Sequence, residues 1–350
     1  WDVKEVKEVL GDAEGELFCK YYDITPRGNF EWRNIPNLIQ TSLDHIEQDQ
    51  ALNEKLEACR SKLFRRREGR IHPHKDDKIL TGWNGLAIAA MAYAGRVMGN
   101  PAYLQAGEKA AAFIRNRLVR EDGRLLARYR EGEAANPATA EDYAFFIWGL
   151  LELYTATFDV EYLEYALALQ KDMFRYFWDE KAGGFFISGK DTKDLILNPK
   201  DAYDGAIPSG NSVAAMNLLR LSKITGNPEW EEKAQRIFSV FGENVSQNPG
   251  AYVYLLMAFL FSTGSGKEIV IAGERNGPDT RKMIEEVNKR FLPFAVVILN
   301  DGQEKLYGLA PHTKEQKRGQ DGKATAYVCE NFQCNAPTAD LQQFAALLDR

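Results

Sequence analysis

Hydrophobic and polar residues follow one another along this chain in a pattern that predicts paired helices. Three segments, residues 81–110, 140–169 and 208–237, can be aligned with one another. In each segment, a helix that is apolar almost all round is followed by a short turn and an amphipathic helix. The first type is typical of a buried position, whereas the second has one solvated face. The pattern therefore predicts a tandem array of αα-hairpins with an inner and an outer layer.

The alignment brings polar residues into equivalent positions at the start of each inner helix, where Asn84, Tyr143 and Asn211 share one position. The returns from outer to inner helix, at residues 123–140 and 183–208, are long. Long loops often carry function, and helix N-termini present free N–H groups and partial positive charge. We therefore predict an α/α toroid with a site at the rim where the inner helices begin. A solenoid of the same hairpins is the alternative.

The pattern changes after residue 264. Residues 268–272 and 294–299 predict short buried strands, with an amphipathic helix at 278–291 between them. Residues 324–329 predict a third strand and residues 340–348 a closing helix. This β-α-β order predicts a small α/β lobe.

The predicted fold class is mainly α, with the toroid at residues 1–264 and the α/β lobe at residues 265–350. The glycines after the first strand of the lobe, Gly273 and Gly277, do not have the spacing of a dinucleotide-binding fingerprint.

Composition narrows the range of partners. The chain is 45% hydrophobic and 27% charged, as in ordinary globular proteins, and its net charge of -6 disfavours nucleic acid as a partner. No apolar run is long enough to span a bilayer. The chain starts at Trp1 without a secretory signal, and we expect a cytoplasmic protein with no membrane partner.

The four cysteines are too few for a disulfide framework. Cys329 and Cys334 have the spacing of neither a redox pair nor a usual zinc site. We expect two unlinked thiols, with a bridge or a metal role as the alternative. We predict no cofactor and no bound metal.

The densest polar cluster precedes the first inner helix. Two aspartates there could form half of an acid/base pair, and a tryptophan could offer a flat face to a sugar ring. The alternative is that these side chains cap or salt-bridge the start of the helix. The candidates are His74, Asp76, Asp77, Lys78, Trp83 and Asn84.

A second cluster opens the next inner helix. Glu141 or Asp142 could project a carboxylate into the mouth of the toroid, with Tyr143 lining it. The structural interpretation is that Thr139 and Asp142 form a capping box. Both interpretations stay open at this point.

The third cluster lies at residues 201–212. Ser209 begins the third inner helix, and Asn211 can donate and accept hydrogen bonds, together with Asp204. The sequence around Ser209 is not a nucleophile elbow, which needs Gly-x-Ser-x-Gly after a strand. A hydrogen-bonding role for Asn211 and Asp204 is therefore favoured over nucleophilic catalysis.

These clusters closely resemble the YyaL/spermatogenesis-associated protein 20 family. The resemblance implies a thioredoxin-like domain followed by an (α/α)6 toroid of the six-hairpin glycosidase type. Neither that domain nor the first toroid hairpins can be found here, so we expect the chain to start inside an incomplete toroid. The missing hairpins and the thioredoxin-like domain would then be partners within the same protein. The matching motifs lie at residues 17–22, 28–31, 74–85, 141–143, 204–212 and 325–329, with Cys334.

The resemblance also implies carbohydrate chemistry, because related toroids act as hydrolases or as sugar 2-epimerases. Those epimerases use histidines on inner helices, whereas all four histidines of this chain lie outside the predicted inner helices. Carboxylates are available instead, which favours hydrolysis or sugar binding.

We therefore predict a carbohydrate-active toroid that binds or hydrolyses a small-molecule sugar at the rim. The alternatives are a non-catalytic scaffold that binds a ligand or partner, and an epimerase that uses His72 or His74. The acid/base candidates are Asp76, Asp77, Glu141 and Asp142. The substrate-binding candidates are His74, Lys78, Trp83, Asn84, Tyr143, Asp204, Ser209 and Asn211.

Overall fold

The computed structural model describes residues 1–193, 195–264, 266–319, 321–330 and 333–349. These residues form two compact units, Trp1–Asp76 and Asp77–Arg350. Each unit has its own hydrophobic core, and each is described by itself below.

The first unit is helical. Its buried core is formed by residues such as Val6, Phe18 and Leu56, which lie on three different helices. Two free cysteines belong to this unit, Cys19 at a partly buried position and Cys59 in the core. The helices are α1 (Val3–Leu10), α2 (Asp12–Tyr21), α3 (Leu43–Gln48) and α4 (Gln50–Glu68).

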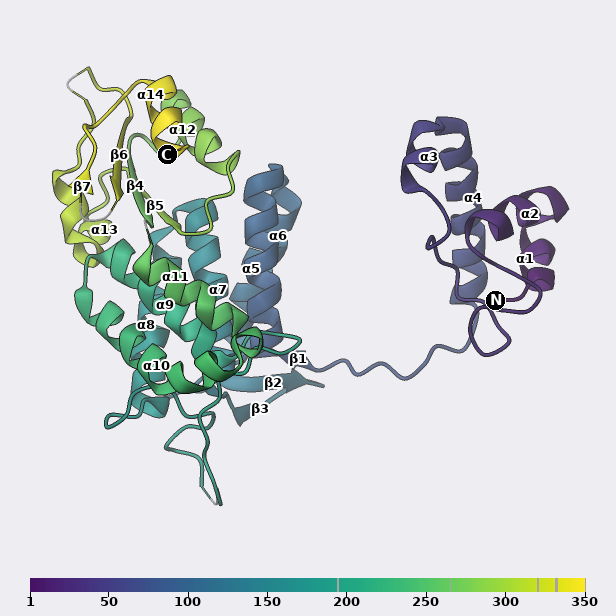
Figure 1. The fold of residues 1–350 in the computed structure, drawn as a ribbon, viewed down its shortest axis with the longest axis horizontal. Helices are drawn as coiled ribbons and strands as arrows, with labels where there is room; N and C mark the ends of the chain where they lie inside the picture. The colour runs from purple at the N-terminus through teal and green to yellow at the C-terminus, as the bar shows by residue number, and fades with distance from the viewer. Residues whose placement is uncertain (194, 265, 320, 331–332, 350) are drawn as a thin grey trace. The chain divides into compact units, whose positions relative to one another are not determined.

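Helical hairpins form most of the second unit (Figure 1). The inner helices α5, α7 and α9 end in the left-handed conformation, at Gly99, Phe158 and Gly226, which stops each helix before the next one begins. Asn100, Asp159 and Asn227 then cap the outer helices. The elements are α5 (Thr81–Met98), α6 (Pro101–Arg117), α7 (Ala140–Thr157), α8 (Val160–Phe177), α9 (Gly210–Thr225), α10 (Pro228–Gln247), η1 (Pro249–Ala251) and α11 (Val253–Thr263).

The hairpins stand side by side in two layers. The inner helices pack in the order α5, α7, α9, α11, and the outer helices α6, α8 and α10 each pack against the inner helix that precedes them. The middle inner helices, α7 and α9, are buried on most of their faces, as their apolar composition predicts. The predicted hairpin array is confirmed, and its layers are those of an incomplete α/α toroid.

Glycines let the inner helices approach closely. A Cβ atom on Gly85 of α5 would lie 2.5 Å from the backbone carbon of Phe145 in α7, and one on Gly149 of α7 would lie 2.8 Å from the Gly85 carbonyl oxygen. Near the start of α9, a Cβ on Gly210 would lie 3.0 Å from the Cα atom of Glu141. Real Cβ atoms essentially never lie closer than 3.0 Å to non-bonded atoms, so Gly85 and Gly149 fix the spacing of α5 and α7, while the contact at Gly210 is tight.

A three-stranded antiparallel sheet lies at the beginning of α5. Its order is β1-β2-β3, and β1 leads directly into the helix. The turn between β2 and β3 uses Glu131 and Gly132, both with positive φ, as two-residue hairpins require. The strands are β1 (Ile79–Leu80), β2 (Leu126–Arg130) and β3 (Glu133–Pro137).

The C-terminal lobe is a four-stranded sheet of order β5-β4-β6-β7, in which β4 and β5 are parallel and the other pairs antiparallel. The predicted strands and helices of this lobe are confirmed to within a few residues. The sequence did not predict α13, η2 or β7. The elements are β4 (Lys267–Ala272), α12 (Pro278–Asn288), β5 (Ala295–Asn300), α13 (Glu304–Leu309), η2 (Pro311–Glu315), β6 (Thr325–Glu330), β7 (Gln333–Cys334) and α14 (Leu341–Leu348).

The lobe packs on the C-terminal ends of the inner helices. Successive side chains of a strand point to opposite faces, and accordingly Val270 joins the hairpin core while Ile269 and Ile271 join the core of the lobe. Phe158, at the end of α7, is buried in that second core, and its carbonyl oxygen accepts a hydrogen bond from Arg275 (2.9 Å). The lobe therefore leaves the N-terminal rim of the inner helices uncovered.

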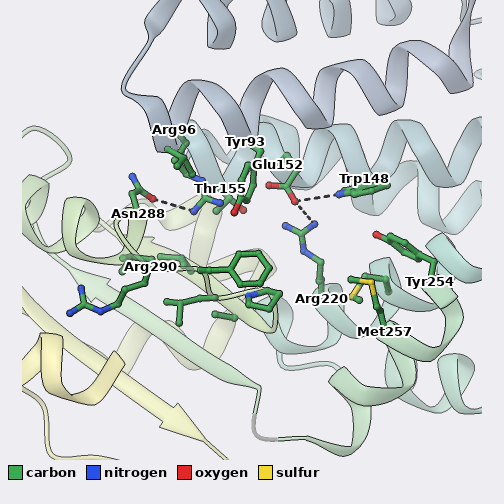
Figure 2. A pocket seen from close by; sticks show the side chains of 18 residues that line it. Tyr93, Arg96, Trp148, Glu152, Thr155, Arg220, Tyr254, Met257, Asn288 and Arg290 are labelled. Carbon is green, nitrogen blue, oxygen red and sulfur yellow. Dashed lines mark hydrogen bonds and ion pairs between the residues drawn. The ribbon is translucent and has the colours of Figure 1, made fainter. Parts of the chain in front are cut away.

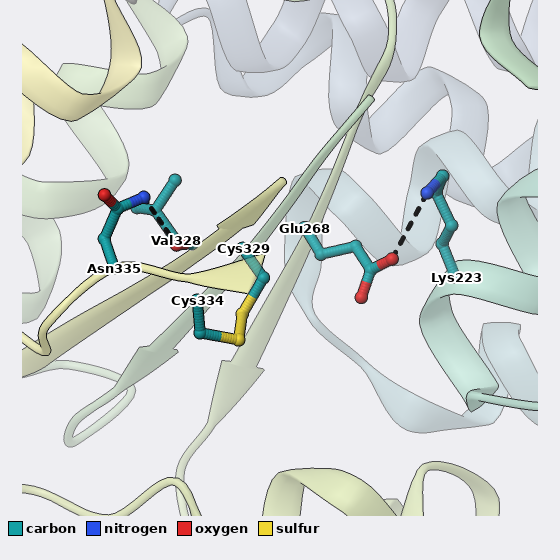
Figure 3. The surroundings of a disulfide bond; sticks show 6 residues. All are labelled: Lys223, Glu268, Val328, Cys329, Cys334 and Asn335. Atoms are coloured by element: carbon teal, nitrogen blue, oxygen red, sulfur yellow. Dashed lines mark hydrogen bonds and ion pairs between the residues drawn. A yellow bond between two sulfur atoms is a disulfide. The ribbon is translucent and has the colours of Figure 1, made fainter. Parts of the chain in front are cut away.

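Cys329 and Cys334 form a disulfide, with Cα atoms 3.9 Å apart (Figure 3). The expectation of two unlinked thiols was wrong. The two residues lie directly opposite each other in the β6–β7 pair, a juxtaposition that hairpin pairing creates and that spacing alone does not reveal. On the neighbouring strand, Glu268 forms an ion pair with Lys223 of α9 (3.2 Å) and links the lobe to the hairpins.

The predicted fold class, an incomplete α/α toroid with a small C-terminal α/β lobe, is confirmed. The predicted division after residue 264 stays a prediction. The helices of the first unit follow no hairpin alignment, and the expectation that residues 1–76 belong to the toroid also stays a prediction.

The close packing of α5 on α7 predicts that Gly85→Ala lowers the free energy of unfolding. The new methyl group would meet backbone atoms that cannot move without separating the two helices, at a cost of about 1–3 kcal/mol. Chemical denaturation monitored by circular dichroism measures the change.

Gly242→Ala is the matched control, because Gly242 also lies inside a helix, α10, but a Cβ there meets no atom within 4 Å. We expect that variant to gain up to about 1 kcal/mol from helix propensity. Equal effects of the two substitutions would contradict the packing described here.

Candidate functional site at the inner-helix rim

The start of α7 is held by a capping box, as the structural interpretation of this segment predicted. The Thr139 side chain accepts a hydrogen bond from the Asp142 N–H, and the Thr139 N–H donates to Asp142 Oδ2 (2.8 Å). The second oxygen, Asp142 Oδ1, accepts from the Gly82 N–H at the start of α5 (2.9 Å). One carboxylate therefore caps its own helix and ties the starts of two neighbouring inner helices together.

Asp204 ties together the starts of the next two inner helices, α9 and α11. Its Oδ1 accepts a hydrogen bond from the Ser209 N–H (2.9 Å), immediately before α9. Its Oδ2 accepts from the N–H groups of Tyr254 (2.8 Å) and Leu255 (3.1 Å), in the first turn of α11. The inner helices α5, α7 and α9 thus begin at one rim, as the alignment predicted, and α11, which lay outside the alignment, begins there too.

Asn211, in the first turn of α9, fixes the long loop that precedes the helix. Its Oδ1 accepts from the Phe185 N–H (2.7 Å), and its Nδ2 donates to the carbonyl oxygens of Phe185 (2.9 Å) and Asp201 (2.8 Å). The side chain is buried and fully engaged with backbone. It shapes the loop around the rim by joining two points 16 residues apart.

An open pocket of about 390 Å³ lies at this rim, between the first turns of α7 and α9 and the loop before α9. Of the predicted site residues, Glu141, Ser209 and Asn211 line it together. Asp201 and Tyr203 line it as well, and both are exposed. The pocket thus combines two carboxyl groups with an accessible aromatic ring.

Glu141 is the titratable group with the most unusual surroundings in this pocket. Partial burial raises the pKa of its carboxyl group, and the nearby negative charges of Asp142 and Asp201 raise it further. The cause is the cost of holding a desolvated carboxylate beside like charges. The protonated, neutral form of Glu141 is therefore favoured more than in an ordinary glutamate.

Several other predicted residues lie at the rim but do not line the pocket. Burial raises the pKa of Asp142, although the hydrogen bonds described above oppose it. The fully buried Tyr143 accepts a hydrogen bond at its hydroxyl group from the Leu125 N–H (3.1 Å). Asn84 donates to the Leu80 carbonyl oxygen (2.8 Å), and Trp83 is exposed nearby on α5. These contacts support structural roles, and binding roles for these residues stay predictions.

The polar cluster before α5 is not gathered into the pocket by any described contact. Asp77 forms an ion pair with Arg130 of β2 (2.9 Å), and Lys78 is exposed beside it. His74 and Asp76 are exposed at the end of the first unit. Their catalytic and binding roles also stay predictions.

Asp201 and Tyr203 were not predicted as site residues from the sequence. The helical alignment begins at residue 208 and gives no information on which loop side chains turn toward the rim. The acidic and aromatic composition of residues 201–204 was the available indication.

Among the described residues, no group of three or more His, Cys, Asp and Glu side chains is placed to hold a metal ion. A search of the same residues finds no helix long and apolar enough to cross a membrane.

Comparison with known proteins identifies relatives along the whole chain. Spermatogenesis-associated protein 20 of Homo sapiens is 34% identical over 99% of this chain and 49% of its own length. The rat protein of the same name is 33% identical, over 99% of this chain and 48% of its own. An uncharacterised protein of Caenorhabditis elegans is 29% identical over 100% of this chain and 51% of its own. The chain spans about half the length of the curated relatives it matches. No protein-family model matches it.

Solved structures give weaker likenesses. A GH76 alpha-mannanase of Bacteroides thetaiotaomicron matches with a TM-score of 0.44 and 14% identity, over 74% of this chain and 78% of its own. A cellobiose 2-epimerase of Bacillus thermoamylovorans matches with a TM-score of 0.43 and 15% identity, over 75% of this chain and 68% of its own.

The hydrogen bonds of Asp204 predict that Asp204→Asn lowers the free energy of unfolding by about 1–3 kcal/mol. An amide offers one acceptor oxygen where the carboxylate has two, and a backbone N–H at the start of α9 or α11 loses its partner. Thermal and urea unfolding measure the loss.

Asp201→Asn, three residues earlier in the same loop, is the control. Asp201 is exposed and its side chain accepts one hydrogen bond, from the Tyr203 N–H, so we expect a change within about 0.5 kcal/mol. If Asp204→Asn is as well tolerated as Asp201→Asn, Asp204 does not join α9 to α11.

The raised pKa of Glu141 predicts a pH-dependent effect of Glu141→Gln on stability. The pKa of Glu141 is higher in the folded than in the unfolded protein. The contribution of Glu141 to the free energy of unfolding is therefore fully present at pH values below its unfolded-state pKa. This contribution is lost as the pH rises through the folded-state pKa. The melting temperature of Glu141→Gln relative to the parent chain should therefore be higher at pH 7 than at pH 4.

Glu133→Gln removes a carboxyl group from an exposed position of β3 and reports the effect of net charge alone. A difference between Glu141→Gln and the parent that stays constant from pH 4 to pH 7 would rule out the raised pKa.

Proposed function

Because the chain belongs to the spermatogenesis-associated protein 20 family along the matched region, we propose that its toroid is carbohydrate-active and that the rim pocket binds a sugar and hydrolyses a glycosidic bond. The observation that carries the proposal is the Glu141 carboxyl group, partly buried and with a raised pKa, next to Asp201 in an open pocket. The chain spans about half the length of its curated relatives. Any activity of a protein of their full length is therefore also a proposal.

Glycoside hydrolysis needs two carboxyl groups in different protonation states. One acts as the acid that protonates the leaving oxygen, and the other, ionised, stabilises the sugar cation, attacks it or activates water. Glu141 suits the first role because its surroundings favour the protonated form. Asp201 suits the second because it is exposed to solvent in the same pocket.

The remaining lining of the pocket suits a sugar. Tyr203 is 59% exposed, and its ring offers the kind of flat apolar face on which sugar rings stack. Ser209 and Gly210 bring backbone of the α9 N-terminus to the pocket wall, where hydroxyl groups can be bound. The loop that carries Asp201 and Tyr203 is held by Asn211, so both side chains are presented by a fixed segment.

A non-catalytic binding pocket is the second candidate, and one observation favours it. Asp142 and Asp204, the other carboxylates at the rim, are occupied by backbone N–H groups. Among the described residues that line the pocket, Glu141 and Asp201 are then the carboxyl groups left for chemistry, and Asp201 is exposed. No histidine is among the described residues that line the pocket, so no observation favours an epimerase.

Glu141→Gln tests the hydrolase directly. On a panel of 4-nitrophenyl glycosides, we expect the parent chain to release nitrophenol from at least one member. The substitution should lower kcat about 100-fold or more while melting-temperature shifts induced by the matching free sugar persist. Activity of the parent should fall as pH rises through the pKa of Glu141, since the acid must be protonated.

Glu133→Gln, outside the pocket, should retain full activity. Sugar-induced stabilisation without turnover by the parent chain would support the binding pocket in place of the hydrolase. Neither stabilisation nor turnover with any sugar of the panel would count against both candidates.

A further inference from the structure

A second cavity, of about 280 Å³, lies away from the rim, between the inner helices and the C-terminal lobe (Figure 2). Its walls come from the C-terminal halves of α5 and α7, from α9 and α11, and from the segment that joins α12 to β5. The volume is at the small end of the range for ligand sites in proteins. None of the residues of this cavity lines the rim pocket.

One ion pair in the wall of this cavity joins two residues whose charges neutralise each other. Arg220 of α9 and Glu152 of α7 form a salt bridge (2.8 Å) with both side chains nearly buried. Trp148 donates its indole N–H to the same Glu152 oxygen (3.3 Å), as Figure 2 shows. The charges of this pair offset one another, so it leaves no net charge for a ligand to neutralise.

Arg290 also lines the cavity, but its guanidinium points away from it (Figure 2). It is bound by both carboxylate oxygens of Asp349 (2.6 and 3.0 Å) and by Glu286 (2.9 Å). This arginine is therefore neutralised outside the cavity.

Arg96 differs from Arg220 and Arg290 because it is not paired with a described carboxylate. It donates from Nη1 to the amide oxygen of Asn288 (3.2 Å), and its Cζ atom lies 5.1 Å from the ring centre of Tyr93. Its Nε atom is buried without a hydrogen-bond partner in the part of the chain that the structure describes. None of the described carboxylates lies within ion-pair distance of it. Arg96 is thus a partly buried cation without a direct ion-pair partner among the described residues; the nearest acidic influence, Glu152, is already paired with Arg220.

Such a group is costly in the folded protein. Taking a cation out of water lowers stability unless an anion or hydrogen-bond acceptors replace the water. Guanidinium remains protonated in proteins, so loss of the proton does not relieve the cost. A buried donor without a partner in a native fold calls for an explanation, and a bound anion supplies one.

We propose that this cavity binds a small organic anion, with a carboxylate or phosphate group held by Arg96 and a ring or apolar body lying along the aromatic wall. Four aromatic side chains line the cavity, Tyr93, Trp148, Tyr254 and Phe291, and the ring centres of Trp148 and Tyr254 lie 5.3 Å apart. An inorganic ion alone would leave this apolar surface unfilled. The site is independent of the sugar chemistry proposed for the rim.

Phenyl phosphate is the probe, because it joins the anionic group to a flat ring. We expect it to bind the intact parent chain with a Kd of about 1 mM or tighter by isothermal titration calorimetry. Phenol and inorganic phosphate, each lacking one half of the probe, should bind at least tenfold more weakly. Equal binding of phenol, or of inorganic phosphate, would overturn the assignment to an organic anion.

Arg96→Gln keeps a donor for Asn288 but removes the charge, and should weaken phenyl phosphate binding about 10–100-fold. Arg96→Lys should recover part of the loss. Arg117→Gln, at an exposed position at the end of α6, is the matched control and should bind as the parent does. A folded Arg96→Gln variant with unchanged affinity would refute the proposal, as would absence of binding to the parent.

Val97→Trp provides a second test if Arg96→Gln fails to fold. Val97 is 45% exposed and lines the cavity, so a larger ring there narrows the cavity without entering the core. Loss of phenyl phosphate binding by this variant supports the site, and unchanged binding contradicts it. Glu141→Gln should leave the affinity for phenyl phosphate unchanged, so the outcome is separate from that at the rim.

Discussion

The structure depends on how closely the N-termini of neighbouring inner helices approach. Glycine leaves no side chain at the points of contact, and partly buried carboxylates accept hydrogen bonds from N–H groups at the helix starts. Asp142 joins α5 to α7 in this way, and Asp204 joins α9 to α11. The positive ends of several helix dipoles meet at one rim, and carboxylates are the side chains that stabilise such an arrangement. The same rim then becomes the natural place for further carboxylates that act on a ligand.

Polar residues at the rim therefore divide into two groups. Those that face backbone, Asp142, Asp204 and Asn211, hold the helices and the loop, while Glu141 and Asp201 face the open pocket. The two groups are linked, because the negative charge of Asp142 contributes to the raised pKa of Glu141. At the other end of the inner helices, the lobe covers the helix ends and encloses Arg96 and its cavity.

The hairpins and the lobe could be predicted because their apolar residues recur with helical or strand periodicity. The equivalence of Asn84, Tyr143 and Asn211 correctly placed the helix starts on one rim. Periodicity does not reveal the direction of a loop side chain, and for that reason Asp201 and Tyr203 were missed. It also cannot reveal hairpin register, which brought Cys329 against Cys334. The role of a polar residue at a helix start depends on which donor it meets, and Asp142 met a backbone N–H of another helix.

Hydrogen–deuterium exchange at single-residue resolution tests the rim arrangement most directly. Amides in the first turn of a helix usually exchange fast because they have no partner within the helix. Here the N–H groups of Gly82, Ser209 and Tyr254 donate to side-chain carboxylates across the rim. We expect these amides to exchange as slowly as those in the middle of α7 and α9. Exchange at the rate of unprotected amides at these three positions would contradict it.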